Sequence, residues 1–279
     1  MNASMINAMV SMNSLQQRLD VISDNIANVN TVGYKKKEAT FEDLLNNLKR
    51  QPDAFNQPGR LTPLHFSQGW GARMTMVEPN LSQGPMKGTD NLTDLAIEGN
   101  ALFEVEVDGA GTRAYTRNGA FQLTMGANGD TILATEDGYP VVANIPDADG
   151  NMVEGNIVMP DGYSLRVEAD GTVRGVSSGD TITLGSIKLL QPSRPAALTP
   201  VADNLFTIAD GINVEDVVQE IIPDSENRIA LRQGYLEQSN VQLTDELTEL
   251  INVQRAYQLA ARALSSSDQM MGIANTMRA

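Results

Sequence analysis

The sequence predicts an α+β fold in which long N- and C-terminal helices pair as a coiled-coil-like unit and an antiparallel β domain is inserted between them. Three observations support this prediction. Two of them concern the ends of the chain, where apolar residues recur every seven positions. The third concerns the middle, where apolar and polar residues alternate between Asp-Gly and Asn-Gly pairs. We expect an N-terminal helix over 1–34, an extended connector over 35–83, an antiparallel β domain over 84–234 and a C-terminal helix over 235–279.

The N-terminal helix is predicted by two apolar rows that together form the a/d seam of a coiled coil. Met is an adaptable filler of cores, so we expect a Met-rich seam to be marginal alone and to become ordered when packed against neighbours. Asn25 and Asn28 lie near the end of the seam, where buried amides set register. Gly33 is predicted to end the helix as a left-handed cap. The rows are Met5, Met12, Leu19, Ile26 and Ala8, Leu15, Ile22, Val29.

Next in the chain, the connector and the middle region differ in their turn signals. A short helix is expected over 41–45, and the prolines and glycines after it indicate extended chain. Alternating segments over 95–97, 101–107 and 115–123 predict strands. Asp-Gly and Asn-Gly favour tight hairpin turns because both residues tolerate positive φ. These pairs stand at 108–109, 118–119, 128–129, 137–138, 161–162, 170–171 and 210–211.

The C-terminal helix is predicted by a second repeat of seven, which contains no proline and one glycine, Gly272. Because it matches the N-terminal repeat, the two helices are expected to form one helical domain closed by both ends of the chain. The main row is Leu243, Leu250, Tyr257, Leu264 and Met271, and Leu247, Gln254 and Ala261 fill the neighbouring row.

Composition narrows the class of partner. The chain of 279 residues has a formal net charge of -15 and a pI of about 4.4. An acidic chain is repelled by nucleic acid and by anionic lipid, so the expected partners are proteins, with no nucleic acid and no direct membrane insertion. No cysteine is present, which excludes disulfides and thiolate sites. The first basic residue is Arg18, and the apolar residues before it are periodic, so no cleaved signal peptide is expected.

Few residues point to chemistry. The lone histidine, His65, has no companion for a metal site, and Trp70 between two glycines reads as a packing anchor. The segment 147–151 has a calcium-like run of acids, but its glycine is misplaced for an EF-hand. We therefore expect no enzyme activity, no cofactor and no metal. The basic cluster 35–37 has two interpretations: a solvated loop, or an electrostatic contact with the acidic face of a next subunit.

Several segments resemble the signature of flagellar basal-body rod and hook proteins. The first motif closes the N-terminal helix and consists of Asn25, Ala27, Asn28, Thr31, Gly33, Tyr34 and Lys35. Further matches follow in the family's order at 41–45, 82–84, 94–99, 115–121, 236–241, 254–257 and 267–270. Within this family the long connector is most similar to that of distal rod proteins. The segment 99–103 departs from the family's usual Gly-x-Gly-Phe-Phe.

The resemblance implies a structural subunit of the flagellar rod, polymerising through its terminal helices into an axial tube that transmits torque. It implies an extracytoplasmic place in the basal body, reached through the flagellar type III export apparatus without a cleaved signal. The implied partners are copies of the chain, other rod and hook proteins and, in transit, that apparatus. Expected interface residues, each of which could also pack within the chain, are Met5, Met12, Leu15, Leu19, Ile22, Asn25, Ile26, Asn28, Leu243, Leu247, Leu250, Tyr257 and Leu264.

Other functions predict other features. A hook or proximal rod subunit would differ mainly in the connector and in the β insertion. A secreted carbohydrate-acting enzyme, with the helices as an oligomerisation clamp, predicts a cleft with close carboxylates of raised pKa. An adhesin or binding module predicts a stable monomer with a ligand pocket.

Overall fold

A computed structural model of the chain describes residues 3–43, 47–49, 66–68, 72–108, 111–126, 129–147, 151–201, 204–209, 211–223 and 229–278. The chain forms two compact units. Unit 1 comprises 1–26, 37–77 and 243–279, and unit 2 comprises 27–36 and 78–242. His65, Trp70 and the centre of the calcium-like run lie outside the described residues. The four-part domain division expected from the sequence stays a prediction.

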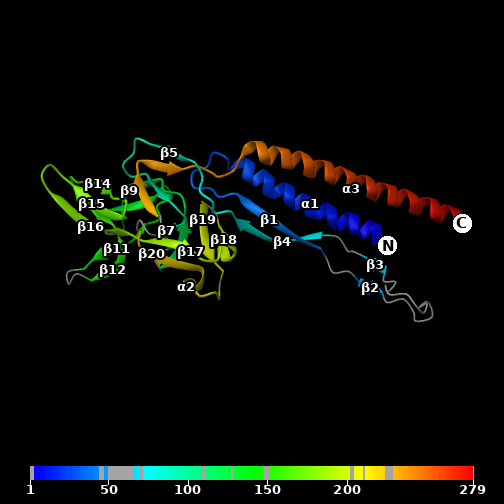
Figure 1. Ribbon diagram of the computed structural model, residues 1–279, viewed down its shortest axis with the longest axis horizontal. Coiled ribbons are helices and arrows are strands. Elements are labelled where there is room, and N and C mark those ends of the chain that lie inside the picture. Colours follow the sequence, from blue (N-terminus) through cyan, green and yellow to red (C-terminus); the bar gives the residue numbers. More distant parts are fainter. Residues whose placement is uncertain are drawn as a thin grey trace, which may run out of the picture. The chain divides into compact units, whose positions relative to one another are not determined.

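Unit 1 contains the two long helices, α1 (Ala3–Ala27) and α3 (Leu243–Arg278) (Figure 1). Asp245 and Glu246 lie in the first turn of α3, where their negative charges interact favourably with the positive end of the helix dipole. β1 (Lys37–Asp43) pairs with β4 (Ala72–Pro79), and β2 (Asn47–Lys49) pairs with β3 (Phe66–Gln68). No helix in the described part of the chain has both the length and the apolar character needed to span a bilayer.

The predicted pairing of the terminal helices as a coiled coil is wrong. α1 and α3 run alongside each other (Figure 1), but most residues of the expected seam are not buried, Ile22 being an exception at 3% exposed. Leu243 and Leu247 are 43% and 44% exposed, and Met5, Met12 and Leu19 are only half-buried. In the described chain strand outweighs helix.

The reason lies in the other partner of α1. The Ser14 hydroxyl donates a hydrogen bond to the carbonyl oxygen of Ala72 in β4. The Arg18 guanidinium lies 5.5 Å from the ring centroid of Phe41 in β1. Part of the surface of α1 therefore faces strands, and its apolar repeat reflects more than one partner.

Three further local predictions are corrected. The short helix expected over 41–45 is wrong, because Phe41 to Asp43 belong to strand β1. The C-terminal helix begins at Leu243, since residues 235–237 form strand β22. α1 ends at Ala27, so Gly33 lies beyond the helix end and does not cap it directly, although its φ of 69° is left-handed as expected.

Unit 2 is antiparallel throughout its described ladders. A six-stranded sheet has the order β18-β19-β8-β7-β17-β20, a five-stranded sheet β12-β11-β16-β15-β14, and a three-stranded sheet β13-β10-β9. Two short ladders, β21-β6 and β22-β5, join the segment before α3 to earlier chain. The expected Asp-Gly turns are present at 137–138, 161–162 and 170–171, between strands.

The bounds of the elements in unit 2 follow in chain order. They are β5 Met86–Gly88, β6 Leu95–Glu98, β7 Leu102–Asp108, β8 Thr112–Thr116, β9 Phe121–Met125, β10 Thr131–Thr135, β11 Val142–Pro146, β12 Met152–Asn156, β13 Val158–Met159, β14 Ser164–Val167, β15 Thr172–Val176, β16 Thr181–Ile187, β17 Leu189–Pro192, the 3₁₀ helix Pro195–Ala197, β18 Leu198–Pro200, β19 Leu205–Ile208, α2 Val214–Val217, β20 Val218–Ile221, β21 Ala230–Gln233 and β22 Tyr235–Glu237.

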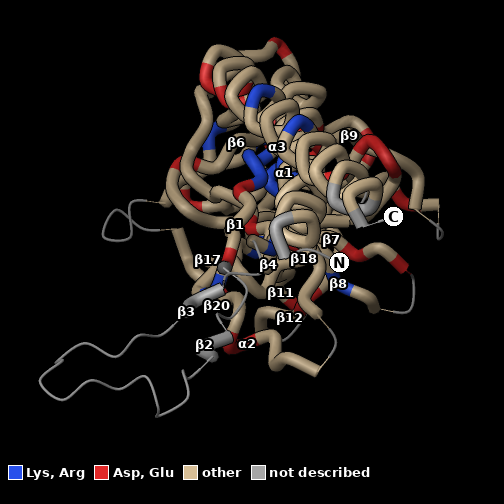
Figure 2. Tube along the Cα trace, turned by 90° about the vertical axis from the view of Figure 1, so that its right-hand side faces the viewer, with Lys and Arg blue, Asp and Glu red and all other residues tan. Residues whose placement is uncertain are grey.

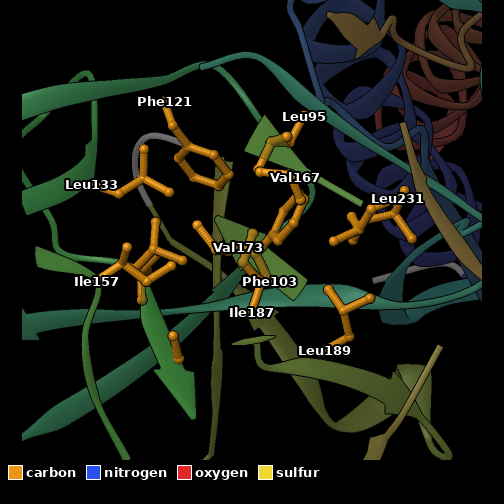
Figure 3. Close-up of a cluster of buried hydrophobic side chains, with 14 of the residues drawn as sticks. Leu95, Phe103, Phe121, Leu133, Ile157, Val167, Val173, Ile187, Leu189 and Leu231 are labelled. Carbon is orange, nitrogen blue, oxygen red and sulfur yellow. The ribbon is translucent and has the colours of Figure 1, made fainter. Parts of the chain in front are cut away.

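Strand β7 is buried on both faces and separates two apolar cores. Phe103 lies in the larger core and meets Phe121 edge-on, with ring centroids 5.0 Å apart (Figure 3). Leu102 lies in the smaller core with Tyr115 and Phe206. Successive side chains of a strand point to opposite faces, so one strand can serve both cores. This explains why three consecutive apolar residues stand at 101–103, at the start of the strand.

Candidate functional site

The segment that follows α1 is held by the amide of Asn25, in the last turn of that helix. The side chain is 1% exposed. Its Nδ2 donates to the carbonyl oxygen of Lys37 at 3.0 Å, and its Oδ1 accepts the amide of Lys37 at 2.9 Å. The same Nδ2 donates to Glu246 Oε2 at 3.3 Å. Asn25 therefore satisfies the backbone of Lys37 as a neighbouring strand would, and it also links that backbone to α3.

A buried ion cluster lies in unit 2 around Glu237, the last residue of β22. Lys35 Nζ donates to Glu237 Oε1 at 2.7 Å, and Arg117 Nε donates to Oε2 at 2.5 Å. The side chains of all three residues are 1% exposed. Arg117 also donates to the carbonyl oxygens of Ile97 at 3.0 Å and Gly99 at 2.6 Å. Buried charges need such partners, because desolvation is otherwise too costly.

The cluster holds two cations against one anion, and the pKa values follow that balance. Burial lowers the pKa of Lys35, as does the neighbouring Arg117, and Glu237 only partly opposes them. Burial raises the pKa of Glu237, but Arg117 and Lys35 lower it by more, so that it lies below its usual range. The arrangement stabilises a charged carboxylate, which is a structural rather than an acid-catalytic role.

Backbone contacts complete the attachment of the segment 31–36. Gly33 donates its amide to the carbonyl oxygen of Glu237 at 2.8 Å, and a Cβ on Gly33 would lie 2.5 Å from the amide nitrogen of Asn118. Lys36 donates its amide to Asn240 Oδ1 at 2.7 Å. Tyr34 is 5% exposed. Segment 31–36 is therefore an integral, packed part of unit 2.

The structure places the family-motif residues Asn25, Gly33, Tyr34 and Lys35 inside the fold. Both interpretations of the basic cluster are wrong for Lys35, because it is 3% exposed and paired with Glu237. Sequence reasoning missed Arg117 and Glu237 as its partners. Both stand in segments that carry the family resemblance, so charged residues within those segments were the available signal.

The terminal helices expose large apolar side chains. Figure 2 marks the charged residues, and the first charged side chain of the chain is Arg18 in α1. Arg18 pairs with Glu249 of α3, its Nε lying 2.8 Å from Oε1. The exposed fractions along α3 are Leu243 43%, Leu247 44%, Ile251 48%, Leu259 64%, Met270 62%, Met271 38%, Ile273 60% and Met277 83%.

The predicted interface residues fall into three classes of exposure. Leu243 and Leu247 are exposed, whereas Ile22 and Asn25 are buried within the chain. The half-buried residues are Met5, Met12, Leu15, Leu19, Ile26, Asn28, Leu250, Tyr257 and Leu264. The role of this set in subunit contacts stays a prediction.

Glu154 and Glu237 lack the raised pKa that a carbohydrate-acting site requires. A hydrogen bond from Lys188 lowers the pKa of Glu154, and the pKa of Glu237 is also lowered. A glycosidase acid needs a raised pKa. Within the described ranges, no group of three or more His, Asp or Glu side chains is arranged to hold a metal ion.

Comparison with known proteins gives consistent matches along the chain. The model described as "Flagella basal body rod protein" matches residues 5–35, "Flagellar hook protein FlgE/F/G D1 domain" matches 96–175, and "Flagellar basal body rod FlgEFG protein C-terminal" matches 232–277. The flagellar basal-body rod protein FlgG of Borreliella burgdorferi is 35% identical over 96% of this chain and 95% of its own length. The flagellar hook-basal body complex protein FlhP of Bacillus subtilis is 34% identical over 99% of both chains.

Proposed function

We propose, since this chain belongs to the flagellar basal-body rod proteins and is a structural subunit of the flagellar rod, that its exposed helix faces make the contacts that build the rod. It is a component of the basal body and assembles with other rod and hook proteins.

The observation that carries the proposal is the apolar surface of α3. Eight large apolar side chains along this one helix are at least 38% exposed, from Leu243 at 43% to Met277 at 83%. Large apolar side chains exposed together on one element mark sites of protein association. Its burial would contribute about 25 cal/mol for each Å² of apolar area removed from water.

The contacts would propagate rather than close. A subunit that presents different faces to its neighbours makes heterologous contacts, which generate a helical polymer. The exposed α3 residues Leu247 and Ile251 and the exposed Met9 of α1 would each meet a different helix of a neighbouring copy. A tube of such subunits would carry torque along its axis.

The route and the place of the subunit complete the proposal. The chain would leave the cytoplasm through the flagellar type III export apparatus, without a cleaved signal peptide, and would act outside the cytoplasm. Its place would be the distal rod. Copies of the chain, other rod and hook proteins and the export apparatus in transit would be its partners.

The test compares assembly of three full-length proteins by electron microscopy at high concentration. One is unchanged, and one carries Leu247→Gln, Ile251→Gln and Leu259→Gln. The third carries polar-for-polar changes at exposed positions of α3, Thr244→Ser, Gln254→Asn and Gln258→Asn. We expect tubes or filaments from the first and third proteins only. Equal assembly of the apolar-to-Gln variant would show that α3 does not carry the contacts.

The same variants need a check of their folded state. Exposed positions tolerate substitution within about 0.5 kcal/mol, so the urea midpoints of the three monomers should agree closely. A variant that fails to assemble while its midpoint is unchanged has lost an intersubunit contact, not its fold.

A further inference from the structure

One carboxylate in unit 2 collects donors from three distant parts of the chain. Glu237 Oε1 accepts Lys35 Nζ at 2.7 Å and the amide of Gly84 at 2.7 Å, and Oε2 accepts Arg117 Nε at 2.5 Å. Lys35 is 202 residues away from Glu237 in sequence, and Arg117 is 120 away. No one of these contacts is local, so none can form before residue 237 is in place.

The N-terminal segment 31–36 depends on the same late part of the chain. Its contacts include Gly33 to the carbonyl oxygen of Glu237 at 2.8 Å and Lys36 to Asn240 Oδ1 at 2.7 Å. The amide Nδ2 of Asn204 donates to the carbonyl oxygen of Val32 at 3.0 Å. Segment 31–36 therefore packs against chain that follows it by many residues.

The positive charges of Lys35 and Arg117 make the packing of segment 31–36 strictly dependent on Glu237. Without the Glu237 carboxylate, the site would bring Lys35 and Arg117 together as two buried cations with no anion between them. An uncompensated buried charge opposes folding far more strongly than a missing neutral hydrogen bond. Lys35 would therefore stay in water until β22 arrives, and it would keep the rest of segment 31–36 with it.

We propose that Glu237 is a closing latch, which admits the N-terminal segment 31–36 to unit 2 only after β22 has formed. The β7-β8 hairpin lies outside this dependence and can form earlier. A chain that lacks or has not yet presented residues 235–240 carries an open N-terminal motif directly after α1. The latch goes beyond the assembly function and does not depend on it.

The first test follows refolding of the unchanged full-length protein by pulsed hydrogen exchange. We expect the amides of Gly33 and Lys36 to gain protection in the same phase as β22 and later than the β7-β8 hairpin. Lys36 is the critical reporter because its acceptor is Asn240, not Glu237. Protection of Lys36 before β22 would overturn the proposal.

The second test compares Glu237→Gln with Glu98→Gln under native conditions. Glu98 pairs with Arg232, but both side chains are exposed, at 43% and 50%, so this control removes an ion pair without opening a buried site. In Glu237→Gln, exchange at Gly33 and Lys36 should rise at least tenfold more than exchange in β15 and β16. Glu98→Gln should leave that ratio unchanged.

A uniform rise in exchange across unit 2 in Glu237→Gln, or no rise at Lys36, would show that Glu237 is an ordinary stabilising residue. If Glu237→Gln does not fold, the refolding experiment on the unchanged protein decides alone, because it needs no substitution.

Discussion

At the scale of single residues, the segment after α1 is positioned by polar side chains and by one glycine. Asn25 holds both backbone groups of Lys37, and Asn240 accepts the amide of Lys36. Gly33, between them in the chain, has a φ of 69°. It also has no room for a side chain, because a Cβ would lie 2.5 Å from the Asn118 amide nitrogen. Each of these residues acts through backbone contacts, which local sequence patterns signal only in part.

The cost of crowding at Gly33 can be separated from the cost of its backbone angle. Gly162 has a φ of 84°, and a Cβ there would meet nothing within 4 Å. Gly162→Ala should lose about 1–2 kcal/mol of unfolding free energy through the left-handed conformation alone. Gly33→Ala should lose that amount and at least about 1 kcal/mol more, since backbone must move. Urea unfolding measures both, and equal losses would contradict a close packing role for Gly33.

Lys35 shows where prediction from sequence ended at this scale. The motif around it was recognisable, and Gly33 was expected to be left-handed. The burial of Lys35 was not expected, because its counter-charge stands 202 residues later and nothing near Lys35 announces it. A cluster of lysines reads as solvated surface unless its distant partners are known.

At the scale of elements, the strands were more predictable than the association of the helices. Turns at 137–138 and 161–162 are set by two adjacent residues, so local sequence suffices to place the strands around them. The heptad rows of α1 did predict a helix. They did not predict its partner, because an apolar face is satisfied equally by a helix or by strands such as β1 and β4. The prediction of a coiled coil was wrong for this reason.

The two halves of α3 should differ in stability in the monomer. Val253 is 5% exposed and Glu246 is 1% exposed, whereas Leu259, Met270 and Ile273 are at least 60% exposed. A helix without tertiary packing is marginal in water. Amides after about residue 256 should therefore exchange faster than those of 246–253, as measured by native-state hydrogen exchange. In assembled material the difference should shrink, and equal protection in the monomer would contradict this account.

At the scale of the whole molecule, the ion cluster makes stability depend on pH. The pKa of Glu237 is lower in the folded state than in the unfolded chain, because Arg117 and Lys35 stabilise its charged form, so the unfolded chain binds more protons at acidic pH. The contribution of Glu237 is complete above the pKa of the unfolded chain and is lost as pH falls through the folded pKa. Urea midpoints between neutral pH and pH 3 should fall more steeply for the unchanged protein than for Glu237→Gln. Parallel curves would contradict this.

The charge pattern of α1 also determines how association of the subunits depends on ionic strength. The molecule has a formal net charge of -15, yet the first charged side chain in α1 is Arg18. Copies of so acidic a chain repel one another, and dissolved ions screen that repulsion over about 8 Å at physiological ionic strength. A contact made through the uncharged turns of α1 contains no ion pair that screening could weaken. Added salt should therefore strengthen a contact made through these turns of α1, whereas it would weaken a contact between opposite charges.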